Sequence, residues 1–110
     1  MYFIYIIRCE RGELYTGITT DVSRRMKEHF GQTEKCAKFT RSHKATALEA
    51  LWQTENRSLA SKLEWSIKRL TRLQKLELIS SQERFGELLP NLEKTAYSRV
   101  AEFDIAELLK

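Results

Sequence analysis

The sequence contains five side chains whose types suit phosphodiester chemistry: Tyr5, Tyr15, Arg25, His29 and Glu64. Attack on a phosphodiester builds negative charge on the phosphoryl and leaving oxygens, and the attacking water must lose a proton. An arginine fork matches phosphoryl oxygens, and a histidine titrates near neutral pH. A tyrosine, with an ordinary pKa of about 10, acts as a base only where cations lower that value. A lone glutamate suits Mg²⁺ or Mn²⁺, because Mg²⁺ keeps most of its waters when a protein binds it.

Each of these side chains alone also has an ordinary structural interpretation. Tyrosines are common in strands, an arginine on a helix is usually solvated, and a histidine is favoured at a helix C-terminus. Glu64 is placed to pair with Lys68, four residues further along a helix. None of these side chains alone indicates catalysis, and which group would be the general base stays open.

The elements that must position these residues follow from local patterns. Residues 2–9 are β-branched and aromatic, which predicts a buried strand, and Gly12 predicts a turn into a second strand over residues 14–18. A helix then begins after the capping side chains of residues 19–21 and ends near Gly31. Arg25 and His29, four residues apart, project from one face of that helix.

The rest of the chain predicts further helices and one strand. Residues 32–45 are expected to form a polar loop or short helix, and residues 47–52 a third strand, although their composition is equally helical. Asn56 is expected to cap a long helix, and residues 73–79 are expected to carry on as helix, either directly or after a bend. Apolar residues at helical spacing predict an amphipathic helix in the tail, at Leu92, Ala96, Val100 and Phe103. The predicted fold is α/β: a small, mainly antiparallel three-stranded sheet flanked by helices, with an extra C-terminal helix.

Two segments of the hairpin carry a family resemblance. Phe3-Ile4-Tyr5 and Tyr15-Thr16-Gly17 resemble the two signatures of the GIY-YIG nuclease superfamily, with Phe3 and Thr16 in place of a glycine and an isoleucine. The family's arginine and histidine then fall on Arg25 and His29. Its metal-binding glutamate falls on Glu64, within a run at residues 57–68 that resembles the family pattern. The resemblance covers residues 2 to about 82 and is closest to the small stand-alone bacterial members.

The resemblance implies a GIY-YIG nuclease domain at residues 1–82, with residues 83–110 as a C-terminal helical extension packed on it. It implies an endonuclease that hydrolyses phosphodiester bonds in DNA with one Mg²⁺ or Mn²⁺ ion held by Glu64. A role in DNA repair or processing is implied as well, although more weakly than the chemistry.

The charge distribution favours a polyanionic partner. The net charge is +4, and residues 87–110 carry three basic and five acidic side chains, which leaves +6 on residues 1–86. Phe39 is expected either to stack on a base or to plug the core. The sequence does not distinguish DNA from RNA as the substrate. The candidate nucleic-acid contacts are Lys35, Lys38, Arg41, His43, Lys44, Lys68 and Arg72.

Other features predict a cytoplasmic protein with no membrane partner. No apolar run approaches about 18 residues, and residues 1–8 lack the features of a signal peptide. Cys9 and Cys36 are far apart, which favours free thiols, and the cysteines and histidines lack zinc-ligand spacing.

Two other functions stay open. One is a catalytically weak nucleic-acid-binding module of the same fold, because Gln74 and its neighbours replace an asparagine that many family members carry. The other is an interaction domain that uses its hydrophobic tail to bind a partner protein or a second copy. We expect that tail more simply to cover its own domain.

Overall fold

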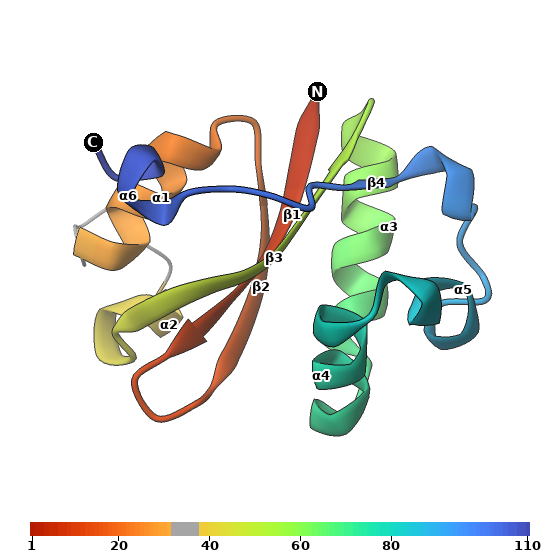
Figure 1. The fold of residues 1–110 in the computed structure, drawn as a ribbon, viewed down its shortest axis with the longest axis horizontal. Coiled ribbons are helices and arrows are strands. Elements are labelled where there is room, and N and C mark those ends of the chain that lie inside the picture. Colours follow the sequence, from red (N-terminus) through yellow and green to blue (C-terminus); the bar gives the residue numbers. More distant parts are fainter. Residues whose placement is uncertain (32–37) are drawn as a thin grey trace.

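The computed structural model describes residues 1–31 and 38–110, which form a sheet covered by helices on both faces (Figure 1). The strand order is β2-β1-β3-β4, and every pair is antiparallel. The strands are β1 (Tyr2–Cys9), β2 (Leu14–Thr19), β3 (Ala45–Thr54) and β4 (Ser98–Arg99). The helices are α1 (Val22–Gly31), α2 (Lys38–Ser42), α3 (Arg57–Lys68), α4 (Arg72–Ser80), α5 (Phe85–Leu88) and α6 (Ile105–Leu108), with 3₁₀ turns η1 (Gln82–Arg84) and η2 (Lys94–Ala96). The predicted α/β class is confirmed.

The opening hairpin has the predicted form. Gly12 adopts a φ of 88°, a conformation that suits glycine in a tight turn, and β2 pairs with β1 throughout its length. The third strand, whose composition was equally helical, is confirmed as β3. β3 pairs with the edge of β1 that β2 does not use, so β1 lies between β2 and β3 in the sheet. Helices cover both faces of β1.

The sheet has four strands, so the predicted count of three was wrong. The outer edge of β3 would otherwise expose unpaired backbone groups, and β4 covers part of that edge. Arg99 lies opposite Trp52 in the register, and the Val100 N–H donates to the Leu51 carbonyl at 2.8 Å. A strand of two residues has no period that sequence analysis could detect.

The predicted amphipathic tail helix was also wrong. Residues 89–104 form turns, η2 and β4, and the helices in the tail, α5 and α6, span only four residues each. The spaced apolar residues are nevertheless used inside the molecule: Leu92 and Ala96 pack against one core cluster and Val100 against the other. Phe103 is 36% exposed.

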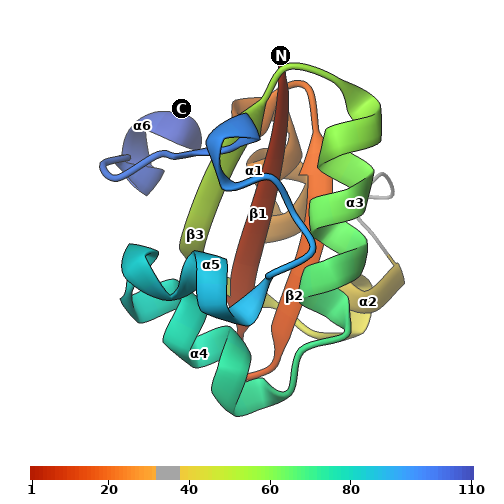
Figure 2. The ribbon, with the colours of Figure 1, turned by 90° about the vertical axis from the view of Figure 1, so that its right-hand side faces the viewer.

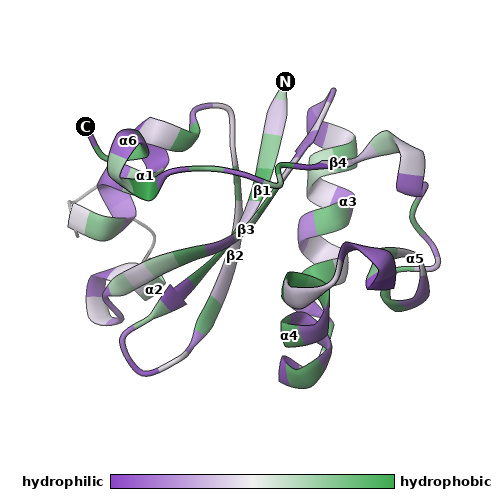
Figure 3. Ribbon diagram, viewed as in Figure 1, coloured by the Kyte–Doolittle hydropathy of each residue, from purple (hydrophilic) through white to green (hydrophobic). Residues whose placement is uncertain are grey.

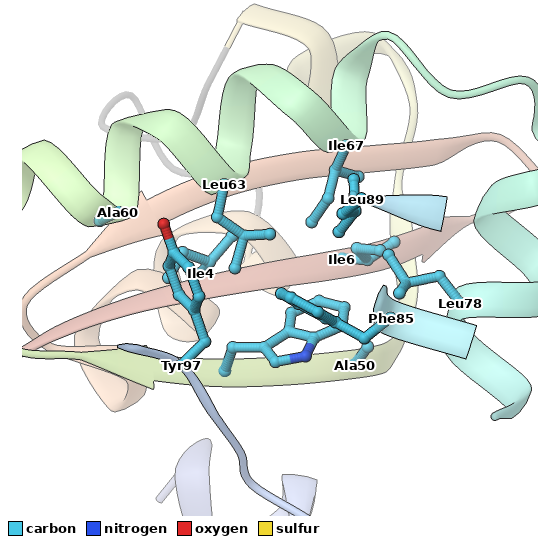
Figure 4. Close-up of a cluster of buried hydrophobic side chains, with 11 residues drawn as sticks. Ile4, Ile6, Ala50, Ala60, Leu63, Ile67, Leu78, Phe85, Leu89 and Tyr97 are labelled. Carbon is cyan, nitrogen blue, oxygen red and sulfur yellow. The ribbon is translucent and has the colours of Figure 1, made fainter. Parts of the chain in front are cut away.

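Two buried clusters lie on opposite faces of the sheet. Ile4 and Ile6 of β1 point toward α3, α4 and α5, where they meet Leu63, Phe85 and Tyr97 (Figure 4). Tyr5 and Ile7 point toward the opposite face, where α1 supplies Val22 and Met26. Burial on both faces explains why β1 reads as a continuous apolar run. In Figure 3, hydrophobic and hydrophilic residues alternate around the turns of α3 and α4, as expected for helices packed on one side.

The helical segment predicted from Asn56 onward consists of two helices, α3 and α4, with a break between them. Asn56 caps α3 through a bond from the Leu59 N–H, as predicted, but the helix ends at Lys68. A new helix, α4, begins with a capping box: the Thr71 hydroxyl accepts from the Gln74 N–H, and the Gln74 side chain accepts from the Thr71 N–H. Among the described residues, no helix combines the length and the apolarity needed to cross a bilayer.

Candidate active site

Tyr5 and Gly17 face each other across the β1–β2 pair, and the tyrosine ring lies directly over the glycine. A Cβ atom added at Gly17 would approach the Tyr5 Cζ to 2.6 Å, closer than real contacts allow. The backbone of Gly17 is not in the left-handed region, so glycine is needed here to make room for the Tyr5 ring and not to form a turn. This close approach lets a side chain of the central strand reach across the edge strand β2.

The Tyr5 hydroxyl ends in a buried chain of polar groups. Its oxygen lies 2.7 Å from Nε2 of His29, and Nδ1 of His29 lies 2.8 Å from the Thr40 hydroxyl on α2. All three side chains are at most 1% exposed. Because buried polar groups in proteins are normally paired, these bonds fix the rings of Tyr5 and His29 in place.

Arg25 lies beside the same hydroxyl. Its guanidinium donates to Tyr5, and its Nη1 donates to Oε1 of Glu28 at 2.8 Å. Since the guanidinium can only donate, the Tyr5 oxygen accepts this bond and the Tyr5 proton points to Nε2 of His29. His29 therefore carries its own proton on Nδ1 and donates it to Thr40.

Burial sets the charge states of this cluster. It raises the pKa of Tyr5 to about 12, against the opposing influence of Arg25. It also lowers the pKa of His29 to about 4, and the positive charge of Arg25 adds to this effect. Burial works to lower the pKa of Arg25, but its bonds to Glu28 and Tyr5 outweigh burial and the net shift is upward. At neutral pH the cluster therefore holds a neutral phenol, a neutral imidazole and a fixed cation.

Glu64 approaches from the other side of β2. It lies on α3, which runs along β2 (Figure 2), and it is close enough to Tyr5 for its charge to contribute to the raised pKa of that phenol. Its Oε2 lies 3.4 Å from Nζ of Lys68, and 24% of the Glu64 side chain is exposed. The Lys68 ammonium also lies 5.7 Å from the centre of the Tyr15 ring.

Tyr15 completes the group. Its ring centre lies 5.6 Å from that of His29, so Tyr5 and Tyr15 flank the same imidazole. The five residues singled out in the sequence thus gather around the edge strand β2, contributed by β1, β2, α1 and α3. Their catalytic roles stay a prediction.

Comparisons with known proteins decide the family. The family model described as the GIY-YIG catalytic domain matches residues 1–77. This chain belongs to the GIY-YIG family. The resemblance carried by the two tyrosine signatures is therefore confirmed. The family is a nuclease superfamily, so the comparison supports the predicted nuclease class.

The relatives of this GIY-YIG domain include small bacterial proteins. The UPF0213 protein YhbQ of Salmonella arizonae is 45% identical over 92 residues, which cover 84% of this chain and 90% of the relative. The UPF0213 protein FN1575 of Fusobacterium nucleatum is 34% identical over 99 residues, 90% of this chain and 97% of the relative. A solution NMR structure of the UPF0213 protein BH0048 from Bacillus halodurans is 40% identical, covers 73% of this chain and 84% of that chain, and has a TM-score of 0.48.

The GIY-YIG family's divalent metal was predicted to bind Glu64. Among the described residues, no group of three or more histidine, cysteine, aspartate and glutamate side chains is placed to enclose a metal ion. One partly exposed carboxylate, with only Oε2 in an ion pair, fits an ion that keeps most of its coordinated waters. It does not fit zinc, which takes three or four protein ligands.

The predicted nucleic-acid contacts of this GIY-YIG domain are only partly gathered around the site. Lys35 lies outside the described residues, and of Lys38 only its position at the start of α2 is described. Arg41 and Lys44 are exposed near α2, and Lys68 lies at the site itself. Arg72 lies at the hairpin turn, where its Nη1 donates to the Gly12 carbonyl at 2.7 Å.

Phe39 has stacking partners within the protein. Its ring stacks on Tyr15, with ring centres 5.5 Å apart, and on His43, with ring centres 4.2 Å apart. His43 in turn lies 3.5 Å from Glu13. Phe39 therefore supports Tyr15 from α2, which is closer to the expected core plug than to a free platform for a base.

Sequence analysis missed two members of the cluster. Glu28 lies three residues after Arg25 on α1, so its ion pair could have been predicted from the helical spacing. Thr40 has no such signal, because its contact with His29 depends on how α2 packs beneath α1.

Proposed function

We propose that this GIY-YIG domain is an endonuclease that hydrolyses phosphodiester bonds in DNA, using one Mg²⁺ or Mn²⁺ ion held by Glu64. One observation carries the proposal: the Tyr5 hydroxyl is held between the Arg25 guanidinium and the neutral Nε2 of His29, near the Glu64 carboxylate. Membership of a nuclease superfamily supports the same conclusion.

Arg25 would bind the phosphate to be cut. Its guanidinium has a fixed direction because Glu28 holds Nη1 and Tyr5 accepts a second bond. A preorganised cation needs no rearrangement as negative charge develops on the phosphoryl oxygens. Glu64 would hold the metal ion on the other side of Tyr5, and when bound the metal would stabilise charge on the leaving oxygen.

Tyr5 and His29 would together remove the proton from the attacking water. The pKa of Tyr5, about 12, is too high for the free phenol to be ionised at neutral pH. Tyr5 would instead pass its proton to Nε2 of His29 while it takes the proton of the water. The lowered pKa of His29, about 4, leaves Nε2 unprotonated at neutral pH and able to receive the proton, but the same low value makes the imidazole a weak base. The imidazolium formed would keep its bond to Thr40 through Nδ1.

The first test compares the wild type with Glu64→Ala on end-labelled DNA that is single-stranded, duplex, flapped or branched, and on RNA of matched sequence. Each substrate is incubated with Mg²⁺, with Mn²⁺ and with a chelator. We expect cutting that needs the metal and disappears in Glu64→Ala. Glu102→Ala is the matched control, because Glu102 is exposed on the tail and should leave cutting unchanged.

Binding without cutting on every substrate would contradict the nuclease and favour the catalytically weak binding module. Cutting confined to RNA would replace DNA as the substrate. The role in DNA repair or processing, the cytoplasmic location and a partner bound through the tail are proposed as well, and the first of these rests on the family alone.

A further inference from the structure

A polar groove lies beside the candidate active site, at the end of the sheet where the N-terminus is marked in Figures 1 and 2. Its volume is about 590 Å³, and it lies between the first turns of α1 and α3. Its charged lining consists of Arg24, Arg25 and Glu28 from α1 and Arg57 from α3. Thr20, just after β2, adds a hydroxyl. None of the predicted nucleic-acid contacts whose side chains the structure describes lines this groove.

The groove has excess positive charge. Three guanidinium groups face one carboxylate, and Glu28 is already paired with Arg25 at 2.8 Å. Arg24 and Arg57 are exposed, and neither has an ion pair within the described part of the chain. Converging cations without a counterion repel each other, so an anion that binds between them gains from both.

Arg25 connects this groove to the candidate active site. It lines the groove and also donates to the Tyr5 hydroxyl, so the two regions share one side chain. Arg57 lies seven residues before Glu64 on α3, about 10 Å along the helix axis. A helical nucleic-acid strand places one phosphate in roughly every 3.4 Å of rise, so roughly three linkages cover that length.

We propose that Arg24 and Arg57 form a second phosphate subsite. It would bind a phosphodiester of the same strand, roughly three linkages from the one that is cut. The inference rests on the proposed nuclease function. It predicts that the nucleic-acid backbone runs across this end of the sheet. A guanidinium fork on each wall would contact the non-bridging oxygens of that phosphate.

The first test measures the salt dependence of binding in the inactive Glu64→Gln protein, with a labelled oligonucleotide as the ligand. Arg24→Ala and Arg57→Ala are each expected to weaken binding and to reduce the slope of log K against log salt by about 0.7 to 0.9. Lys94→Ala should leave both unchanged, because Lys94 lines a different cavity. Arg57→Lys should restore the slope, since it keeps the charge.

The second test locates the phosphate. Single linkages of the oligonucleotide are replaced in turn by a neutral methylphosphonate. At the linkage roughly three positions from the one that is cut, the replacement should weaken binding to the protein with Arg57 intact and cause no further loss in Arg57→Ala. Equal losses in both proteins at every linkage would overturn the subsite.

The outcomes separate the two proposals. If the wild type cuts DNA but the arginine variants keep the full salt slope, the subsite is wrong and the nuclease stands. If neither the wild type nor Glu64→Gln binds or cuts any nucleic acid, both are wrong.

Discussion

The Tyr5 hydroxyl oxygen lies 2.7 Å from Nε2 of His29, although the two residues are 24 positions apart on a strand and a helix. Thr40, a further 11 positions along the chain, holds the opposite ring nitrogen at 2.8 Å. The imidazole therefore has one nitrogen that can accept from Tyr5 and one that is committed to donating. This arrangement selects one tautomer, and it connects the structure of α2 to the chemistry at Tyr5.

Replacing Thr40 by valine should impair activity through His29. Valine keeps the shape but leaves the buried Nδ1–H without this partner, which costs about 1–3 kcal/mol of stability. Activity should fall roughly 10- to 100-fold, as when other histidine-orienting groups are removed. Thr40→Ser restores the hydroxyl and should recover most of the rate. A Thr40→Val protein that unfolds earlier but cuts at the wild-type rate would show that Thr40 has only a structural role.

Gly17→Ala should displace the Tyr5 ring. The added Cβ would lie 2.6 Å from Cζ, and both residues are fixed by the strand pairing, so the ring must move. We expect a stability loss of about 1–3 kcal/mol from overpacking, and a fall in cutting rate of roughly 100-fold, because small misplacements of reacting groups are costly.

The matched control for Gly17→Ala is Gly86→Ala. A Cβ at Gly86 would meet nothing within 4 Å, and Gly86 lies in a helix. This variant should keep full activity and be as stable as the wild type or more so, by up to about 1 kcal/mol. Equal activity in both alanine variants would show that cutting does not depend on where the Tyr5 ring lies.

The parts of this structure that the sequence could predict are those encoded locally. The hairpin follows from Gly12 between two apolar runs, and the shared face of Arg25 and His29 follows from their spacing on one helix. A bend after α3 was left open, and the capping box of Thr71 and Gln74, which would have decided for a new helix there, was not recognised. Gln74, noted as a departure from the family pattern, is used in that cap.

Other features depend on contacts between distant segments. The charge state of His29 depends on its burial where α2 packs against α1. The strand β4 forms only because the outer edge of β3 has no other strand to pair with. The groove of Arg24 and Arg57 joins the starts of two helices that are more than 30 residues apart. No periodicity or motif in either helix indicates the other.

The stability of the protein should decrease in mild acid because of His29. Its pKa is about 4 when folded and 6.5 ordinarily, so the unfolded chain binds the proton more readily. The contribution of His29 to the free energy of unfolding is fully present above pH 6.5 and is lost as the pH falls from 6.5 toward 4. Below pH 4 it changes little. The shift corresponds to about 3 kcal/mol. Urea unfolding between pH 7 and 4, compared with His29→Gln, should show this difference in pH dependence, and parallel curves would contradict it.

Tyr97 should stabilise the domain from the tail without taking part in the chemistry. Its ring packs against Phe85 in the cluster behind α3, and its hydroxyl donates to the Leu59 carbonyl at 2.7 Å. Tyr97→Ala should cost about 3–5 kcal/mol, and Tyr97→Phe about 1 kcal/mol. Urea unfolding followed by tryptophan fluorescence would report both, because Trp52 is buried in the same cluster.

The Tyr97 variants also test whether the tail covers its own domain. Below the unfolding midpoint, both should cut at the wild-type rate, since Tyr97 packs on the face of the sheet opposite Tyr5 and its bond to α3 is at Leu59, five residues before Glu64. A Tyr97→Ala protein with wild-type stability would mean that Tyr97 does not hold the tail on the domain. The tail would then be better explained as a surface for a partner or a second copy.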